Sequence, residues 1–146
     1  MADIQAFGVA NAGTFNANVV DNDGDPSTVL DAALDFKVTC DWQLSGFLVG
    51  ALAGNFELAA YVESIGPGRE QQIGTPPNVT VTVPITGVAN YGPIDISVPA
   101  NTLPDQNALA GDSGVYKLIT VLSHRNTFGN FSDVSAFVEG PILRIS

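Results

Sequence analysis

The sequence is poor in charge, and most of its charge has one sign. Charged residues make up 14% of the 146 residues, and 15 acidic residues stand against 5 basic ones, for a net charge of −10. An average domain carries about 25% charged residues. A field of this sign repels phosphate backbones and anionic lipid surfaces, so we expect neither nucleic acid nor an anionic membrane as a partner.

Cysteine and histidine are also scarce, because each occurs once, as Cys40 and His124. One cysteine cannot form an intrachain disulfide, and the pair cannot supply the usual ligands of a structural zinc site. A Ser–His–Asp triad would need His124, which ends a predicted strand and is expected at the surface. Glu57 and Glu63 lie roughly 20 Å apart on one predicted strand, too far for a glycosidase pair. The sequence therefore predicts no enzyme.

A long uninterrupted apolar run is missing as well. The most apolar stretch, residues 42–62, is interrupted by Ser45, Asn55 and Glu57, whereas a membrane-spanning helix needs about 20 apolar residues. We therefore expect no membrane span. The chain opens with MADIQAFGV, which lacks a basic segment followed by a long apolar one. This opening predicts no signal peptide and leaves the compartment unknown.

Alternation of apolar and polar residues is the main pattern that the chain does show. Phe36, Val38, Cys40 and Trp42 alternate with polar residues, which predicts a half-buried strand over 35–44 with both Cys40 and Trp42 in the core. Similar signals predict further strands at 56–63, 79–85, 94–98 and 115–123, and one strand or two over 134–138 and 142–145. Many short strands separated by turn signals favour a sandwich or a barrel.

The remaining segments give weaker predictions. Ser27–Leu34 is the best candidate helix, and Gly87–Pro93 predicts a turn. Residues 101–113 and 126–133 are expected to be loops. Residues 1–26 are less patterned, which indicates an N-terminal arm or a first strand, and residues 27–146 are expected to form a single β-sandwich domain.

One tract resembles a known family. Asp112-Ser-Gly-Val-Tyr116-Lys-Leu118 is similar to the D-x-G-x-Y-x-C pattern near the start of strand F in immunoglobulin-like domains. The resemblance implies that Tyr116 bonds back to upstream backbone and that Cys40 lies on a strand placed as strand B. Leu118 stands where the family has its second cysteine, and Trp42 does not match the family's tryptophan on strand C.

The same resemblance extends over about residues 35–146, because segments between 95 and 126 also look like strands of fibronectin type III modules. It implies an all-β, immunoglobulin-like antiparallel β-sandwich of about seven to eight strands. That sandwich hosts many functions, so the resemblance predicts the fold and leaves the function open.

An acidic run provides the one hint of a metal. Asp21, Asp23 and Asp25 lie at alternate positions, and carboxylate oxygens are the ligands that calcium prefers. The run is not an EF-hand, because Gly24 lies between the second and third acids and no glutamate occurs before Glu57. A looser calcium loop and an acidic turn without metal both remain open.

Two non-enzymatic functions follow from these observations. The first is a self-assembling structural or interaction protein, a filament, appendage or decoration subunit whose partner is itself or another protein. Low charge and 45% hydrophobic residues leave two possibilities open, an exposed apolar surface or a well-packed sandwich whose exposed face is Thr, Ser, Asn and Ala. Open edges or an N-terminal arm can pair by strand addition. If residues 1–20 form such an arm, their deletion is expected to give monomers of intact fold.

The alternative is a calcium-dependent or carbohydrate-binding adhesion module. Its candidate residues are the three aspartates of the acidic run together with Tyr91 and Phe128, which are expected to be exposed loop aromatics.

Overall fold

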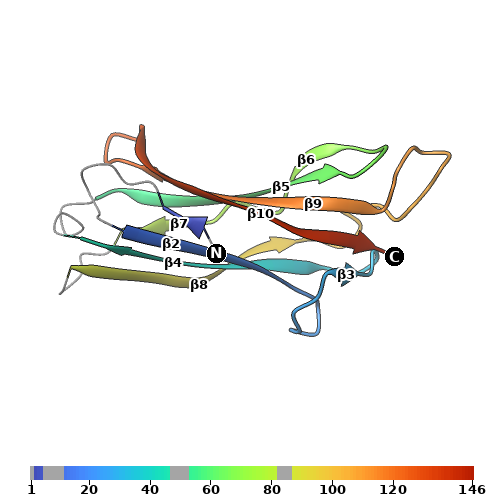
Figure 1. Ribbon diagram of the computed structural model, residues 1–146, viewed down its shortest axis with the longest axis horizontal. Coiled ribbons are helices and arrows are strands. Elements are labelled where there is room, and N and C mark those ends of the chain that lie inside the picture. The colour runs from blue at the N-terminus through green and yellow to red at the C-terminus, as the bar shows by residue number, and fades with distance from the viewer. Residues whose placement is uncertain (1, 5–11, 47–52, 82–86) are drawn as a thin grey trace.

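Ten strands form two stacked sheets in the computed structural model, which describes residues 2–4, 12–46, 53–81 and 87–146 (Figure 1). Sheet A has the order β1-β2-β4-β8, and sheet B has the order β3-β10-β9-β5-β6 with β7 paired to β5. The strands are β1 (Ala2–Asp3), β2 (Ala12–Val20), β3 (Val29–Leu30), β4 (Phe36–Ser45), β5 (Asn55–Ser64), β6 (Glu70–Ile73), β7 (Asn78–Thr80), β8 (Val88–Val98), β9 (Val115–Arg125) and β10 (Phe131–Ile145). The predicted all-β sandwich is confirmed, with ten strands in place of seven to eight.

Period-two alternation accounts for the long strands and for the core between the sheets. In β4, β5 and β9 every second side chain is buried, and the residues between them face solvent. The largest fully buried side chains include Trp42, Phe15 and Phe56. Trp42 stacks on Tyr91, with ring centroids 5.3 Å apart, and meets Phe56 edge-on at 5.4 Å. Aromatic pairs in these geometries add stability beyond the area that they bury.

Two predictions of local structure were wrong. No helix forms at Ser27–Leu34, because Val29–Leu30 is strand β3, which pairs in parallel with the end of β10. The predicted turn at Gly87–Pro93 is also absent, because β8 runs through it. Gly92 has a φ of 103°, and a Cβ there would lie 2.6 Å from the Cys40 carbonyl oxygen. The glycine therefore permits a bulge within the strand. Glycine and proline are common in turns as well as in bulges, so the sequence pattern predicted a turn here.

The N-terminal segment contributes a strand to the sandwich. β2 pairs with β4 from Ala12 to Val20, and it buries Phe15 and Val19. Deleting residues 1–20 would therefore remove part of the core, which contradicts the expectation that the deletion leaves the fold intact. Residues 5–11, residues 47–52 of the apolar stretch and most of the predicted strand at 79–85 lie outside the described residues.

The end of the chain, where one strand or two were expected, is a single strand. β10 joins the predicted strands at 134–138 and 142–145, and its register against β9 shifts between Glu139 and Ile142. Gly140 and Pro141 occupy that shift, as expected for a proline at a bulge. Across the described part of the chain, no helix is long and apolar enough to span a membrane.

Candidate functional site

The outward side of sheet B carries a cluster of apolar side chains. β5, β9 and β10 each turn their unburied positions to solvent, and the register places Ala59 beside Val121 and Val121 beside Phe137. Tyr61 lies beside Ile119 in the next row. Phe137, Ile142 and Tyr61 are 60%, 47% and 40% exposed. We call the set the apolar face; it consists of Ala59, Tyr61, Ile119, Val121, Phe137 and Ile142.

Ion pairs flank the apolar face at both ends of its strands. Lys117 Nζ lies 3.3 Å from Glu63 Oε2, and Arg125 Nε donates to Glu57 Oε1 at 2.8 Å. The Arg125 guanidinium also lies over the ring of Phe131, 3.8 Å from its centroid. The charges of these two pairs therefore neutralise one another, whereas Glu139, which stands opposite Ile119, is a further exposed carboxylate on the same side of sheet B.

The outward side of sheet A has a different character. Thr39 Oγ1 donates to Asp95 Oδ1 at 2.8 Å, and Lys37 Nζ donates to Asp95 Oδ2 at 3.1 Å. These hydrogen bonds, that of Thr39 first, hold the pKa of Asp95 below its ordinary value. Gln43 and Asn90 form a further cross-strand hydrogen bond of 2.7 Å. The polar groups of this surface bind one another and solvent.

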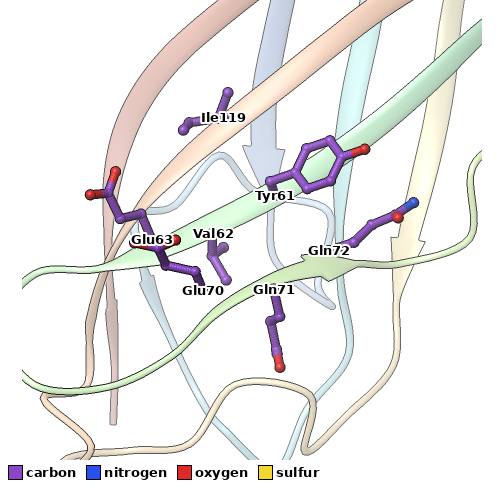
Figure 2. A pocket seen from close by; sticks show the side chains of 7 residues that line it. All are labelled: Tyr61, Val62, Glu63, Glu70, Gln71, Gln72 and Ile119. Atoms are coloured by element: carbon purple, nitrogen blue, oxygen red, sulfur yellow. The ribbon is translucent and has the colours of Figure 1, made fainter.

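A groove of about 450 Å³ lies beside the apolar face, along β5 and β6 (Figure 2). Figure 2 shows Tyr61 and Gln72 extending toward the same end of the groove, while Glu63 and Glu70 gather at the other end. Glu63 and Glu70 are directly opposite in the β5–β6 pair, where two carboxylates repel each other. Tyr61 belongs both to the groove and to the apolar face.

The acidic run forms a self-contained loop. Asp21 Oδ1 accepts hydrogen bonds from the backbone N–H groups of Asp23 and Asp25, both at 3.0 Å. Such bonds are those of an Asx-type turn. Within the described residues, no three His, Cys, Asp or Glu side chains are grouped so that they could hold a metal ion. The calcium site at Asp21, Asp23 and Asp25 thus stays a prediction without geometric support.

His124 is buried at 2% exposure, so its predicted place at the surface was wrong. It follows Leu122 on the inner side of β9 and packs against Phe56. Its Nε2 donates to the Ala53 carbonyl oxygen, and its Nδ1 lies 2.7 Å from Ser132 Oγ. Since a carbonyl only accepts, Nε2 carries the proton of the neutral imidazole, and Nδ1 then accepts from the serine hydroxyl.

The chemistry at His124 follows from this arrangement. Burial lowers the pKa of His124, and the hydrogen bond to Ala53 opposes that shift in part. A catalytic histidine of a triad is oriented by a carboxylate, whereas a backbone carbonyl takes that position here. The contacts of His124 are those of a neutral core residue.

The structure also places the predicted structural residues. Cys40 and Trp42 are both in the core, as the alternation predicted. Burial, and then the carboxylates of Asp41 and Asp95, raise the pKa of the Cys40 thiol to about 12, so its reactive thiolate form is suppressed. Trp42 Nε1 is buried without a hydrogen-bond partner among the described residues.

Tyr116 and Asp112 lie at the start of β9. The buried Tyr116 ring places its hydroxyl to donate to the Pro104 carbonyl oxygen at 3.1 Å, twelve residues upstream. Burial, and then the nearby Asp112, raise the pKa of Tyr116. Asp112 closes the preceding loop through reciprocal backbone hydrogen bonds with Asn107. The tyrosine contact is of the kind that the resemblance implies, while the family itself stays a prediction.

The two aromatics named for carbohydrate binding differ. Tyr91 is buried in the aromatic core, so it cannot present a ring to a ligand, whereas Phe128 is 88% exposed in the β9–β10 loop. Sequence reasoning missed Tyr61 and the apolar face. The signal was present in β9, where Ile119 and Val121 lie on the side opposite Leu118 and Leu122, so both sides of one strand are apolar.

Comparison with known proteins finds no match for the chain among protein-family models, curated proteins or solved structures.

Proposed function

We propose that the protein is a non-enzymatic interaction protein that assembles with further copies of itself through the apolar face. The observation that carries the proposal is the row of solvent-facing apolar side chains on β5, β9 and β10. An antiparallel sheet with one solvated side normally places polar residues there. Contiguous exposed apolar patches on soluble proteins mark association surfaces, because covering them removes apolar area from water.

The charge distribution supports a second copy as the partner. With a net charge of −10, copies repel each other over most of their surface. Three of the five basic residues, Lys117, Arg125 and Arg144, lie on β9 and β10 and point outward from sheet B. Two of them are already paired with Glu63 and Glu57. Two copies can therefore meet at this surface with less repulsion than their net charge implies.

The immunoglobulin-like resemblance belongs to the same proposal. With β4 taken as strand B and β9 as strand F, β8 takes the place of E beside β4, and β5 and β10 take the places of C and G beside β9. The hydrogen bond of Tyr116 supports the same assignment. A sandwich of this kind presents two solvent-facing sheet surfaces, of which the apolar face is one.

A single substitution at the centre of the apolar face tests the proposal. Ile119→Lys places a charge on the middle strand of sheet B, whereas Gln43→Lys places the same charge on β4 of sheet A and serves as the matched control. Light scattering after size-exclusion chromatography measures the mass of each variant. We expect the wild type and Gln43→Lys to form oligomers of equal mass and Ile119→Lys to form smaller species.

Two results would contradict self-assembly through this face. One is a wild type that elutes as a 15.2 kDa monomer up to millimolar concentration. The other is an oligomer whose mass is the same in all three proteins, which would place the contact elsewhere. Circular dichroism confirms that each variant keeps its strands.

The groove favours saccharide binding as a second candidate function. Tyr61 presents a partly exposed ring, and Gln72, Glu63 and Glu70 supply hydrogen-bonding groups along the same groove (Figure 2). Ligand sites commonly combine an apolar wall with a few polar groups. Native gels that contain a series of soluble polysaccharides test this function. Retardation that Tyr61→Ala abolishes and Phe128→Ala preserves would support the groove; equal retardation of both variants would reject it.

A further inference from the structure

The first half of β10 is an open sheet edge. Residues 135–139 pair with β9 on one side. On the other side, β3 pairs with β10 only at Arg144 and Ile145, and no other described strand pairs with β10 there. Residues 135–139 therefore form an edge with its own hydrogen-bonding groups.

The register identifies which backbone groups face the open side. The Val115 carbonyl oxygen accepts from Ile65 N–H, so the odd-numbered residues of β9 direct their backbone groups toward β5. Ile119 and Val121 share this parity and stand opposite Glu139 and Phe137 of β10. In an antiparallel pair, residues that face each other without exchanging hydrogen bonds direct their N–H and C=O groups outward. Hence the backbone groups of residues 135, 137 and 139 point to the open edge.

Residues 135–139 of this edge lack most of the devices that block strand addition. Such devices include proline, lysine, bulges and very short strands. β8 contains Pro93, and β6 has four residues. The edge of β2 is partly covered, since Ser27 N–H donates to the Val19 carbonyl oxygen. Residues 135–139 of β10, SAFVE, contain no proline, glycine or lysine, and they pair regularly with β9 between two register shifts, one before Ser135 and one after Glu139.

Space is available beside the edge. A groove of about 290 Å³ lies between β1 and β10, lined by Ala2 and Asp3 on one side and by Ser135, Ala136 and Phe137 on the other. The lining side chains other than Phe137 are small, and β1, which forms the far wall of the groove, is only two residues long. The groove lies at the residues whose backbone groups face outward.

We propose that residues 135–139 of β10 pair in antiparallel fashion with the same residues of a second copy across a two-fold axis, with Phe137 opposite the partner's Phe137. An antiparallel strand can pair with its own copy in this way, and each residue contact then occurs twice. This register places Ser135 opposite the partner's Glu139. Centring the pair on Asp133 or Glu139 instead would oppose two like charges, which is destabilising.

The edge contact rests on the proposed self-assembly and adds a second interface to it. Strand addition joins the two sheets through main-chain hydrogen bonds, whereas the apolar face joins them through side chains. A copy that uses both contacts has two neighbours, which is the requirement for a filament subunit.

Ser135→Pro tests the edge, with Ser135→Thr as the matched control. Proline removes an N–H that the fold does not use, so the monomer should retain its strands, while the threonine keeps the N–H. Sedimentation velocity over a dilution series measures self-association. Since the two-fold axis doubles the loss, we expect Ser135→Pro to raise the dissociation constant about tenfold or more and Ser135→Thr to leave it unchanged. Equal dissociation constants for the two variants would overturn the edge contact.

Hydrogen exchange on the wild type gives a measurement that needs no variant. The amides of Phe137 and Glu139 should be protected at high protein concentration and should lose that protection on dilution. The amides of Ala136 and Val138 point toward β9 and should stay protected at both concentrations. Protection of Phe137 and Glu139 that does not change with dilution would reject the pairing.

The two contacts fail separately. If Ile119→Lys leaves the assembly unchanged while Ser135→Pro reduces it, the apolar face is rejected and the edge stands. If Ser135→Pro leaves the assembly unchanged while Ile119→Lys reduces it, the edge is rejected and the face stands.

Discussion

On sheet A, the side chains that point to solvent bind one another: Thr39 and Lys37 both donate to Asp95, and Gln43 binds Asn90. On sheet B, the corresponding positions of β9 hold Ile119 and Val121, with Tyr61 and Phe137 on the neighbouring strands. Both surfaces cover the same core. The difference shows that folding requires one buried side of each sheet and does not fix the chemistry of the other side. The apolar residues on the solvent-facing side of sheet B therefore need an explanation beyond folding.

The comparison assumes that the two sheets share one core. Trp42→Ala tests this assumption, and it has the largest expected effect on the free energy of unfolding. Trp42 contacts the rings of Phe15, Phe56 and Tyr91, which come from both sheets. Its truncation should cost about 3–5 kcal/mol of unfolding free energy, measured by urea denaturation in a single transition. Trp42→Phe, which also removes the unpaired indole N–H, should cost clearly less. Separate transitions for two parts of the molecule would contradict a shared core.

A second prediction concerns His124, on the inner side of β9. His124→Gln should cost about 1–3 kcal/mol at pH 7.5, because it disturbs a buried hydrogen-bonded group. The pKa of His124 is lowered in the folded state, so the wild type binds a proton more readily when unfolded and loses stability as the pH falls below about 6.5. The stability difference between the two proteins should therefore narrow from pH 7.5 to pH 5. A difference that is constant with pH would show that His124 titrates alike in both states.

A reciprocal exchange of isosteric residues sharpens the contrast without changing charge. Val121→Thr on the apolar face should weaken self-association several-fold and change the unfolding free energy by less than about 0.5 kcal/mol. Thr39→Val on sheet A removes a hydrogen bond to Asp95, so it should cost about 1 kcal/mol of stability and leave association unchanged. Sedimentation and urea denaturation of both variants separate the two effects. The opposite assignment of effects would reverse the roles of the two faces.

The smallest expected effect concerns the exposed ion pair of sheet A. Lys37 and Asp95 are 43% and 39% exposed at the side chain, and pairs so exposed contribute about 0–1 kcal/mol. Lys37→Ala should therefore shift the unfolding free energy by less than about 0.5 kcal/mol, and 1 M salt should remove most of that shift. A loss of several kcal/mol would mean that the polar surface of sheet A also holds the fold together.

The sequence predicted three of the long strands well, because alternation of period two marks a half-buried strand wherever it is regular. Residues 35–44, 56–63 and 115–123 correspond to β4, β5 and β9 with errors of one or two residues at their ends. Prediction from the sequence failed where pairing with a distant strand decides the conformation. Val29–Leu30 is a strand because the end of β10 lies beside it, and β8 continues through Gly92 because the glycine fits against Cys40.

For the candidate site, the sequence left an exposed apolar surface open as one of two possibilities and could not locate it. Low charge and alternating apolar residues are visible in the chain, and so are the two apolar sides of β9. Sheet A packs against one face of sheet B, and this packing decides which side of β9 is buried. The same packing buries His124 and Tyr91. Strand alternation follows from local backbone geometry, so the sequence alone indicated it. Strand order, the open edge of β10 and the placing of Tyr61, Ile119 and Phe137 on one surface depend on contacts between residues far apart in the chain, so only the tertiary structure decided them.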